Sequence, residues 1–388
     1  MSSNAYDVVV IGGGIVGAAC AAECAKEKLK VALVEARMIG GGATGAGMGH
    51  LVVMDDSEAQ FALTRYSQVL WNELGDELPR TVEHDACGTI WVAADDEEMA
   101  EVLRKERFYS ERGVAVQVLD AQALAEAEPN LRRGLVGGLR VPGDSVIYPP
   151  CAAQFFIDRA RAFGAQLFVR KAVQEITSDG VRLRDGSTIS AGVVVNASGS
   201  WSPELTPGLN VKKRKGHLVI TDRYPNFLRH QLVELGYLKS AHSVTADSVA
   251  FNIQPRNTGQ LLIGSSRQYD VDHSRVDGSI VTRMLARAME YLPALAKLSA
   301  LRTWTGFRAA TPDKLPLIGP ATPAPATLAK SATGHERLYL ATGHEGLGIT
   351  TSLATAKLLV DQLLTRTPAI PIQPYLPSRM APETTARV

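Results

Sequence analysis

The segment YDVVVIGGGIVG at residues 6–17 decides the fold of this chain. The apolar run at residues 7–11 predicts a buried strand, the alanine-rich residues from about 15 to 28 predict a helix, and the run at 31–34 predicts a second strand. Strand, glycine-rich turn, helix and strand in this order are typical of the βαβ unit that binds a dinucleotide.

The glycines of this turn have separate physical roles. Gly12 permits a tight turn, Gly14 lets a pyrophosphate approach the backbone, and Gly17 lets the helix pack closely on the strand. Free N–H groups at the start of the helix favour the phosphate charge. Glu35, at the end of the second strand, can accept hydrogen bonds from both ribose hydroxyls, and its charge disfavours a 2′-phosphate. The unit therefore predicts NAD or FAD rather than NADP.

A second glycine-rich segment at residues 40–49 follows the second strand. Its glycines would let the backbone approach a flat, bulky ring system, whereas a plain NAD-binding domain normally proceeds to another helix and strand. A flexible linker is the alternative. The segment favours FAD over NAD.

Composition sets limits on the class of protein. The chain has 388 residues, of which 45% are hydrophobic and 21% charged, and its formal net charge is +1. This length suits two or three lobes, and the balanced charge argues against a nucleic-acid-binding protein. The one basic run, residues 212–215, is interpreted as a solvated strand edge. No apolar run approaches the roughly 18 residues of a transmembrane helix.

The four cysteines are Cys20, Cys24, Cys87 and Cys151, and their spacing is not that of a zinc or iron–sulfur site. Cys20 and Cys24 are interpreted as small core residues of the first helix. No metal is expected, and no signal peptide is recognised. We therefore expect a cytoplasmic protein, with peripheral association to the inner membrane left open.

Glycine-containing turns return late in the chain. Residues 193–201 predict a buried strand that ends in a glycine turn, and further glycine loops occur at 304–319 and 338–349. A strand-rich stretch lies between them, so a substrate-binding lobe inserted into a discontinuous nucleotide-binding domain is predicted. The proline-rich tail after Arg366 is expected to pack poorly.

Together these motifs resemble the D-amino acid oxidase-like family of FAD-dependent oxidoreductases, over essentially the whole chain. The resemblance rests on the N-terminal glycine turn, NASGSW at 196–201, the segment from Gly306-x-Arg308 to TPD at 311–313, and ATGH at 341–344. Two further motifs are most similar to the FAD-bearing subunits of D-hydroxyproline dehydrogenase, opine oxidase and hydrogen cyanide synthase: MGHL at 48–51 and HEGLGITT at 344–351.

The resemblance implies an α/β fold of two domains. One is a glutathione-reductase-like FAD-binding Rossmann domain, and the inserted substrate domain is built on a mixed β-sheet that lies over the flavin. We expect the FAD-binding domain at residues 1–80, 141–215 and 305–388, and the substrate-binding domain at 81–140 and 216–304.

The resemblance also implies a set of cofactor contacts. Around the ADP half and the pyrophosphate they are Gly12, Gly14, Ile15, Val16, Gly17, Glu35, Ala36, Arg37, Ala43, Thr44, Gly45, Gly47, Met48 and, through its backbone at the adenine, Val173. The later motifs add Ala197, Ser198, Gly199, Trp201, Gly319, Gly343, Gly346, Leu347, Gly348, Ile349 and Thr350. The last five would place N–H groups and a helix N-terminus at the flavin's pyrimidine edge, where the reduced flavin carries negative charge.

FAD is expected to be bound without a covalent link. Relatives with covalently attached flavin carry a His at the position of Ala46 or a Cys near Ala309 and Ala310. The chain also departs from many relatives at Ala46 and Gly47, where these have Arg and Asn, so the loop is expected to engage the flavin differently.

Arg308 matches the family arginine that grips the substrate carboxylate through two parallel hydrogen bonds and turns the substrate Cα–H toward flavin N5. A structural ion pair with Asp313 is the alternative. His50 and His344 are further candidate catalytic residues, and each could equally be a hydrogen-bonded structural histidine.

The expected reaction is oxidation of the Cα–N bond of a D-amino or imino acid to an imine by hydride transfer to flavin N5. Arg308 and the strand residues Asn252 and Gln254 are the candidate substrate contacts. The first candidate substrate is cis-4-hydroxy-D-proline, which would give a pyrroline carboxylate; glycine, sarcosine and an opine are alternatives.

The electron acceptor could be oxygen, but the resemblance implies a hetero-oligomer with iron–sulfur or flavin electron-transfer subunits. Two alternatives from other classes stay open at this point. One is an NAD-dependent dehydrogenase, which the C-terminal glycine loop disfavours, and the other is a non-catalytic flavin-binding assembly subunit or RNA-modification scaffold.

Overall fold

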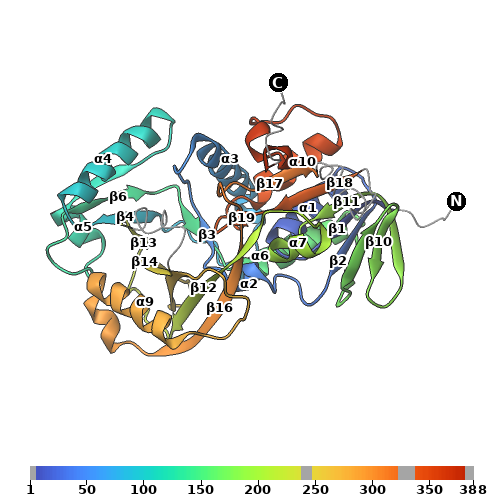
Figure 1. Cartoon of the computed structure of the whole chain (residues 1–388). Helices are drawn as coiled ribbons and strands as arrows, with labels where there is room; N and C mark the ends of the chain where they lie inside the picture. The colour runs from blue at the N-terminus through green and yellow to red at the C-terminus, as the bar shows by residue number, and fades with distance from the viewer. Residues whose placement is uncertain (1–5, 237–246, 322–336, 381–388) are drawn as a thin grey trace, which may run out of the picture.

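The computed structural model of the chain describes residues 6–236, 247–321 and 337–380. One large β-sheet lies in each half of the elongated molecule, and helices pack against both sheets (Figure 1). Each sheet is assembled from segments far apart in the sequence, so the chain passes between the two halves several times.

The first sheet has eight strands: β1 (Tyr6–Ile11), β2 (Val31–Glu35), β8 (Gln166–Val169), β9 (Val173–Thr177), β10 (Gly180–Leu183), β11 (Thr188–Asn196), β17 (Leu317–Pro320) and β18 (Leu338–Thr342). Their order is β17-β18-β11-β1-β2-β8, with β10 pairing β11 and β9. The pairs of β1 with β2 and β11, of β11 with β18, and of β2 with β8 are parallel. The central strands read as apolar runs because cores lie on both faces of the sheet.

In the described part of the chain, the long helices of this half are α1 (Ile15–Lys26), α3 (Glu58–Leu74), α6 (Pro149–Ala162) and α10 (Ser352–Leu363). The short helices α2 (Ala43–Ala46) and α7 (Ser202–Leu205) flank the sheet's end. Helix α1 packs against both α6 and α10, and its many alanines let these helices approach closely. Cys20 and Cys24 are fully buried there, so their interpretation as core residues is confirmed.

The second sheet has nine strands: β4 (Thr89–Ala93), β5 (Gln117–Asp120), β6 (Gly137–Val141), β12 (Lys212–Thr221), β13 (Gln231–Glu234), β14 (Ser248–Pro255), β15 (Leu261–Arg267), β16 (Ala300–Ala310) and β19 (His344–Glu345). Their order is β19-β16-β12-β15-β14-β13-β4-β6-β5, and all pairs except β13 with β4 are antiparallel.

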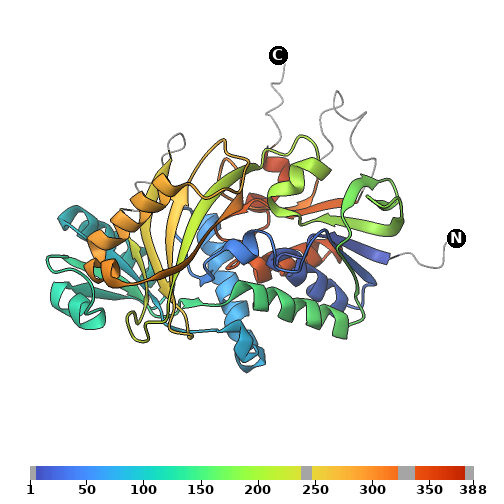
Figure 2. The ribbon, with the colours of Figure 1, turned by 90° about the horizontal axis from the view of Figure 1, so that it is seen from below.

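Within residues 6–236, 247–321 and 337–380, three helices pack on the second sheet. Helix α9 (Gly278–Tyr291) lies along β14 and β15 (Figure 2), and α4 (Asp96–Glu111) and α5 (Ala121–Ala127) pack near β4, β5 and β6. A separate pair of short strands, β3 (His50–Leu51) and β7 (Ser145–Val146), joins the two halves.

The predicted α/β architecture with a mixed second sheet is confirmed. Strands β12 and β16 each cross one of the predicted domain boundaries, at 215/216 and 304/305. The division of the chain into two domains stays a prediction. Every helix in the described residues is too short or too polar to cross a lipid bilayer.

The interpretation of the basic run 212–215 was wrong. Strand β12 lies inside the sheet between β15 and β16, so this run is not an edge. Arg214 is 9% exposed, and Lys215 is fully buried with its Nζ donating to the carbonyl oxygen of Arg275 at 2.6 Å. Partners far along the chain satisfy these charges, and the local sequence does not reveal them.

The tail after Arg366 packs better than predicted as far as residue 380. Tyr375 is 1% exposed, and its hydroxyl donates to the carbonyl oxygen of Ala59 at 2.6 Å. The prediction was wrong for this part because one buried aromatic ring anchors a proline-rich segment. Residues 381–388 lie outside the described residues.

Candidate functional site

A large cavity lies between the two sheets. Its volume is about 740 Å³, within the range of ligand and cofactor sites. Its lining comes from the carboxyl ends of β1, β2 and β11, from α2 and its flanking glycines, and from β12 and β16 of the second sheet. The carboxyl ends of parallel strands are where open α/β sheets bind their ligands.

The turn between β1 and α1 forms one end of the cavity. Gly12 has a φ of +108°, which side chains disfavour, and a Cβ there would lie 2.6 Å from the carbonyl oxygen of Ala197. Gly14 caps α1 and lines the cavity. The N-terminus of a twelve-residue helix therefore borders the cavity, and its backbone N–H groups favour an anion there.

Glu35 ends β2 in the same region. Its carboxylate accepts hydrogen bonds from the backbone N–H groups of Gly13 and Arg37, both at 2.7 Å. These bonds fix the carboxylate at the cavity and leave other lone pairs for hydroxyl donors. The position suits the expected ribose contact.

The second glycine-rich segment is part of the cavity wall. Thr44 is buried, and its Oγ1 accepts a hydrogen bond from the N–H of Ile15 at 3.0 Å, which ties α2 to the start of α1. A Cβ on Gly47 would lie 2.8 Å from Cδ1 of Ile349, so this glycine packs closely against the loop before α10. The segment is therefore a packed element rather than the flexible linker of the alternative interpretation.

The loop before α10 forms another part of the cavity wall. Gly346, Gly348 and Ile349 line it, and the Oγ1 of Thr350 donates to the carbonyl oxygen of His50 at 2.8 Å. This bond joins the C-terminal motif to strand β3. Backbone N–H groups near a helix start can stabilise negative charge, as the resemblance implied for this loop.

Most of the expected site residues meet at this cavity. The cofactor candidates that line it are Gly12, Gly14, Ile15, Val16, Glu35, Ala36, Arg37, Ala43, Thr44, Gly47, Met48, Val173, Ala197, Ser198, Gly199, Trp201, Gly346, Gly348 and Ile349. The catalytic and substrate candidates that line it are His50, Asn252, Arg308 and His344.

Seven expected residues, all in the described part of the chain, do not line this cavity: Gly17, Gly45, Gln254, Gly319, Gly343, Leu347 and Thr350. Gly17 has a packing role, since a Cβ there would lie 2.0 Å from the carbonyl oxygen of Gly12. Gln254 supports the wall instead, because its Nε2 donates to the carbonyl oxygen of Met48 at 2.8 Å.

Both candidate histidines are neutral groups in the wall. Burial lowers the pKa of His50 to about 4 and that of His344 to about 3. The Nε2 of His344 shares a hydrogen bond with the Oγ1 of Thr355 at 2.9 Å. This contact favours the structural interpretation of His344.

The side chain of Arg308 extends from β16 across the neighbouring strand β12. A Cβ on Gly216 would lie 2.6 Å from Nη1 of Arg308, so the guanidinium occupies space that this glycine leaves. Nη1 donates to the carbonyl oxygen of Ser266 at 3.0 Å. Asp313, the alternative partner, pairs with Arg379 at 2.7 Å instead. Arg308 thus borders the cavity in a defined orientation.

A second cavity of about 90 Å³ lies beside the first. The two cavities share the lining residues His50, Asn252, Glu345 and Gly346. Sequence analysis missed Arg214 and Arg267, which line the second cavity, and Glu345, which lines both. The available signals were the basic run at 212–215 and the acid within the HEGLGITT motif.

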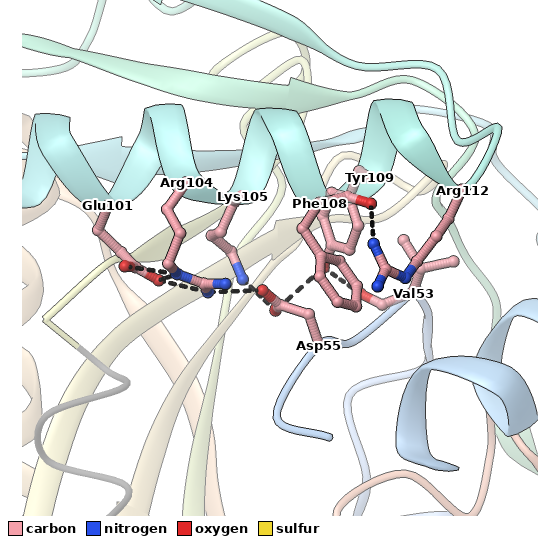
Figure 3. A network of polar contacts seen from close by, with 8 residues as sticks. All are labelled: Val53, Asp55, Glu101, Arg104, Lys105, Phe108, Tyr109 and Arg112. Atoms are coloured by element: carbon pink, nitrogen blue, oxygen red, sulfur yellow. Dashed lines mark hydrogen bonds and ion pairs between the residues drawn. The ribbon is translucent and has the colours of Figure 1, made fainter. Parts of the chain in front are cut away.

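A buried ion pair anchors one wall of the second cavity. Asp55 follows Val52 and Met54, which line this cavity, and its carboxylate pairs with Lys105 and with Arg104 of α4 (Figure 3). The Asp55 and Lys105 side chains are 1% and 0% exposed. Burial raises the pKa of Asp55, but Lys105 and Arg104 outweigh it and hold the pKa below its ordinary value. This ion pair therefore fixes the segment at residues 52–55 to helix α4, which packs on the second sheet.

The lining of the large cavity fits FAD. Four buried polar atoms of the lining residues have no hydrogen-bond partner among the described residues: His50 Nε2, Ser200 Oγ, Asn252 Oδ1 and Ser265 Oγ. Buried polar atoms are normally paired, so this cavity is suited to a ligand with many polar groups. The helix N-terminus and Glu35 at one end match an adenosine pyrophosphate.

Comparison with known proteins agrees with this assignment. The chain matches the family described as "FAD dependent oxidoreductase" over residues 7–362. It is 27% identical to the hydrogen cyanide synthase subunit HcnC of Pseudomonas aeruginosa, with 99% of this chain and 98% of that protein covered. It is 29% identical to the glycine oxidase of Geobacillus kaustophilus, with 96% and 97% covered.

Solved structures show the same fold. The crystal structure of the Geobacillus kaustophilus glycine oxidase superimposes with a TM-score of 0.84 at 28% identity, covering 98% of this chain and all of that one. The L-proline dehydrogenase of P. horikoshii also gives a TM-score of 0.84, at 24% identity, covering 97% and 98% of the two chains.

Proposed function

Because the chain belongs to the FAD dependent oxidoreductase family, we propose that it oxidises the Cα–N bond of a D-amino or imino acid to an imine. Within this class, cis-4-hydroxy-D-proline is the first substrate to test, and an opine is an alternative. The observation that carries the proposal is Arg308, whose guanidinium borders the cavity and can bind a substrate carboxylate through two parallel hydrogen bonds.

Bound FAD would supply the acceptor for a hydride. The substrate would lose that hydride from Cα and a proton from nitrogen, so that the C–N single bond becomes a C=N double bond. Arg308 would hold the carboxylate and so orient Cα. His50 and His344 are neutral near pH 7, which is compatible with a reaction driven by the lone pair of a neutral amine without a general acid.

Glycine oxidation is a second candidate function. It is supported by the 29% identity to a glycine oxidase over 96% of this chain. Glycine or sarcosine would use the same carboxylate contact at Arg308 and would leave much of the second cavity to solvent.

We further propose that electrons leave through a partner subunit that carries iron–sulfur clusters or flavin, in the cytoplasm. The support is the identity to a protein named as a subunit of hydrogen cyanide synthase. The test compares the rate of oxygen consumption with the rate at which an artificial electron-accepting dye is reduced. Fast turnover with the dye and slow turnover with oxygen would support a partner subunit. Fast formation of hydrogen peroxide would instead assign an oxidase.

The central experiment is the visible spectrum of the purified protein under anaerobic conditions. Addition of cis-4-hydroxy-D-proline, D-proline, glycine, sarcosine or an opine is expected to bleach the flavin band with at least one of them. Replacement Arg308→Lys is expected to raise the amine concentration for half-maximal bleaching roughly tenfold or more, because the bidentate contact is lost. A flavin that no amine bleaches would instead support a non-catalytic assembly subunit.

A further inference from the structure

The second cavity extends the site away from the large one. It lies between the second sheet and the segment that follows β3. His50, Asn252 and Glu345 line both cavities and therefore stand at the boundary between them. Its volume of about 90 Å³ is several times what one water molecule requires. A substrate bound at Arg308 could therefore place a small substituent there.

Three arginines gather on adjacent strands at this place. Arg214 on β12 and Arg308 on β16 are direct cross-strand partners, and Arg267 ends the neighbouring strand β15. Arg214 and Arg267 are 9% and 5% exposed. Like charges on directly opposed residues are unfavourable, and buried charges need compensation. The cluster therefore requires negative charge nearby.

The described residues supply part of that charge. Glu345 lies 2.7 Å from Nη1 of Arg214, and Asp56 lies 3.8 Å from Nζ of Lys314. Burial raises the pKa of Glu345, but Arg308, Arg267 and Arg214 outweigh burial and hold it below its ordinary value, so Glu345 is ionised.

The balance of charge is positive. Among the described residues that line the second cavity, together with Arg308, four cationic side chains face two carboxylates, an excess of two positive charges. One anionic group that this lining favours is the substrate α-carboxylate, which the proposed function assigns to Arg308. The buried guanidinium groups of Arg214 and Arg267 also favour a second anionic group, in the second cavity itself.

Two buried amides also point to a polar occupant. Gln60 and Gln231 line the second cavity and are 6% and 2% exposed. The Oε1 atom of each has no hydrogen-bond partner among the described residues, and the oxygen and nitrogen of such an amide can exchange places by a flip. Their N–H groups can therefore turn toward a carboxylate.

We propose that the substrate carries a second carboxylate, which binds in the second cavity near Arg267 and Arg214 while Arg308 holds the α-carboxylate. The substrate class is an amino or imino acid with a short carboxyalkyl substituent. This inference rests on the proposed function and deepens it. Of the substrates named above, it favours the opine class, whose members carry such a substituent on nitrogen, over cis-4-hydroxy-D-proline.

The test uses ligands that differ in one charge. Iminodiacetate and its monoamide have nearly the same size, but only the first has two carboxylates. Flavin bleaching under anaerobic conditions gives the half-maximal concentration for each compound. We expect iminodiacetate to be preferred roughly tenfold or more, the effect of one charge-assisted contact. A preference of less than twofold overturns the proposal.

Variants test whether Arg267 causes the preference for iminodiacetate over its monoamide. Arg267→Gln is expected to abolish the preference, Arg267→Lys to keep most of it, and Arg182→Gln, at an exposed ion pair of β10, to leave it unchanged. Equal loss in the Gln and Lys variants, with normal thermal stability, would contradict a charge contact. A preference that survives Arg267→Gln would contradict the assigned position.

Binding without turnover separates this inference from the proposed function. Glutarate and glutaramate, its monoamide, contain no oxidisable amine, and each can be titrated by its effect on the flavin spectrum and on thermal stability. If no amine bleaches the flavin but glutarate binds more tightly in an Arg267-dependent manner, the second anion site stands and the proposed oxidation fails. If sarcosine bleaches the flavin and neither dicarboxylate is preferred, the oxidation stands and this inference fails.

Discussion

Glu35 shows how one side chain prepares the cavity for its ligand. Two backbone N–H groups already hold its carboxylate, so the group is oriented before any hydroxyl reaches it. Pre-orientation of this kind lowers the cost of ordering on binding. The carboxylate therefore contributes to affinity as well as to the choice between nucleotides.

Replacement Glu35→Ala is expected to weaken FAD binding roughly tenfold or more, since charge-assisted hydrogen bonds contribute about 1.5–3 kcal/mol each. The measurement is titration of the apoprotein with FAD, followed by flavin fluorescence. Glu175→Ala, at an ion pair whose glutamate is 47% exposed, is the matched control. An affinity within twofold of the unmodified protein would show that Glu35 does not contact the cofactor.

At the scale of the element, strands β12 and β16 together position the side chain of Arg308. The two strands pair along almost their whole length, and Gly216 provides the space that the guanidinium fills. Because the colliding atoms belong to the far end of a flexible side chain, an added methyl group would move Arg308 rather than break the sheet.

Replacement Gly216→Ala is therefore expected to raise the substrate KM roughly tenfold while changing Tm by only a few degrees. Steady-state kinetics and a thermal melt measure the two effects. Gly278→Ala is the control, because a Cβ at this helix start meets no atom within 4 Å. A Gly216→Ala variant with unchanged KM would mean that the orientation of Arg308 is not set by this glycine.

The elements differ in how far local sequence predicts them. The boundaries of the first βαβ unit are predicted within about two residues, because its apolar runs and glycines are local signals. The charged half of β12 was misread, because its buried charges depend on Glu345, whose ion pair with Arg214 spans 131 positions. The cavity wall at Gly12 and Glu35 was predictable because its signals are local. The approach of Arg214 and Arg267 to Arg308 was not, because it depends on pairing between distant strands.

At the scale of the whole molecule, two histidines of the cavity wall make the stability of the fold depend on pH. Their folded-state pKa values of about 4 for His50 and about 3 for His344 lie below the ordinary value of 6.5. A depressed folded-state pKa gives stability that is present above pH 6.5 and is lost as the pH falls toward 4 and 3.

Unfolding free energy is therefore expected to fall by several kcal/mol between about pH 6.5 and pH 4. Denaturant titrations across this range measure it. His344→Gln, which keeps a polar partner for Thr355, is expected to flatten the profile. An unchanged slope in this variant would show that His344 is protonated equally in the folded and unfolded states.

The pair of Asp55 and Lys105 joins the two halves of the molecule. Lys105→Met removes the buried cation and leaves the Asp55 carboxylate with Arg104 and the Tyr109 hydroxyl, and is expected to destabilise the protein by about 3 kcal/mol. The double variant Lys105→Met plus Asp55→Asn is expected to recover most of this loss. Lys171→Met, at an exposed pair, is expected to change stability by less than about 0.5 kcal/mol. Chemical denaturation compares them, and a loss below about 1 kcal/mol for Lys105→Met would assign the pair no structural role.

The lining of the large cavity is drawn from residue 11 to residue 349 of the 388-residue chain. Strand β1 pairs with β11, which follows it by more than 180 positions, and the last wall is the loop before α10. A chain still on the ribosome can form the first βαβ unit, but it cannot close the cavity until this late loop has emerged. Capture of FAD is consequently expected only after the loop at residues 346–349 has left the ribosome and packed against the first βαβ unit.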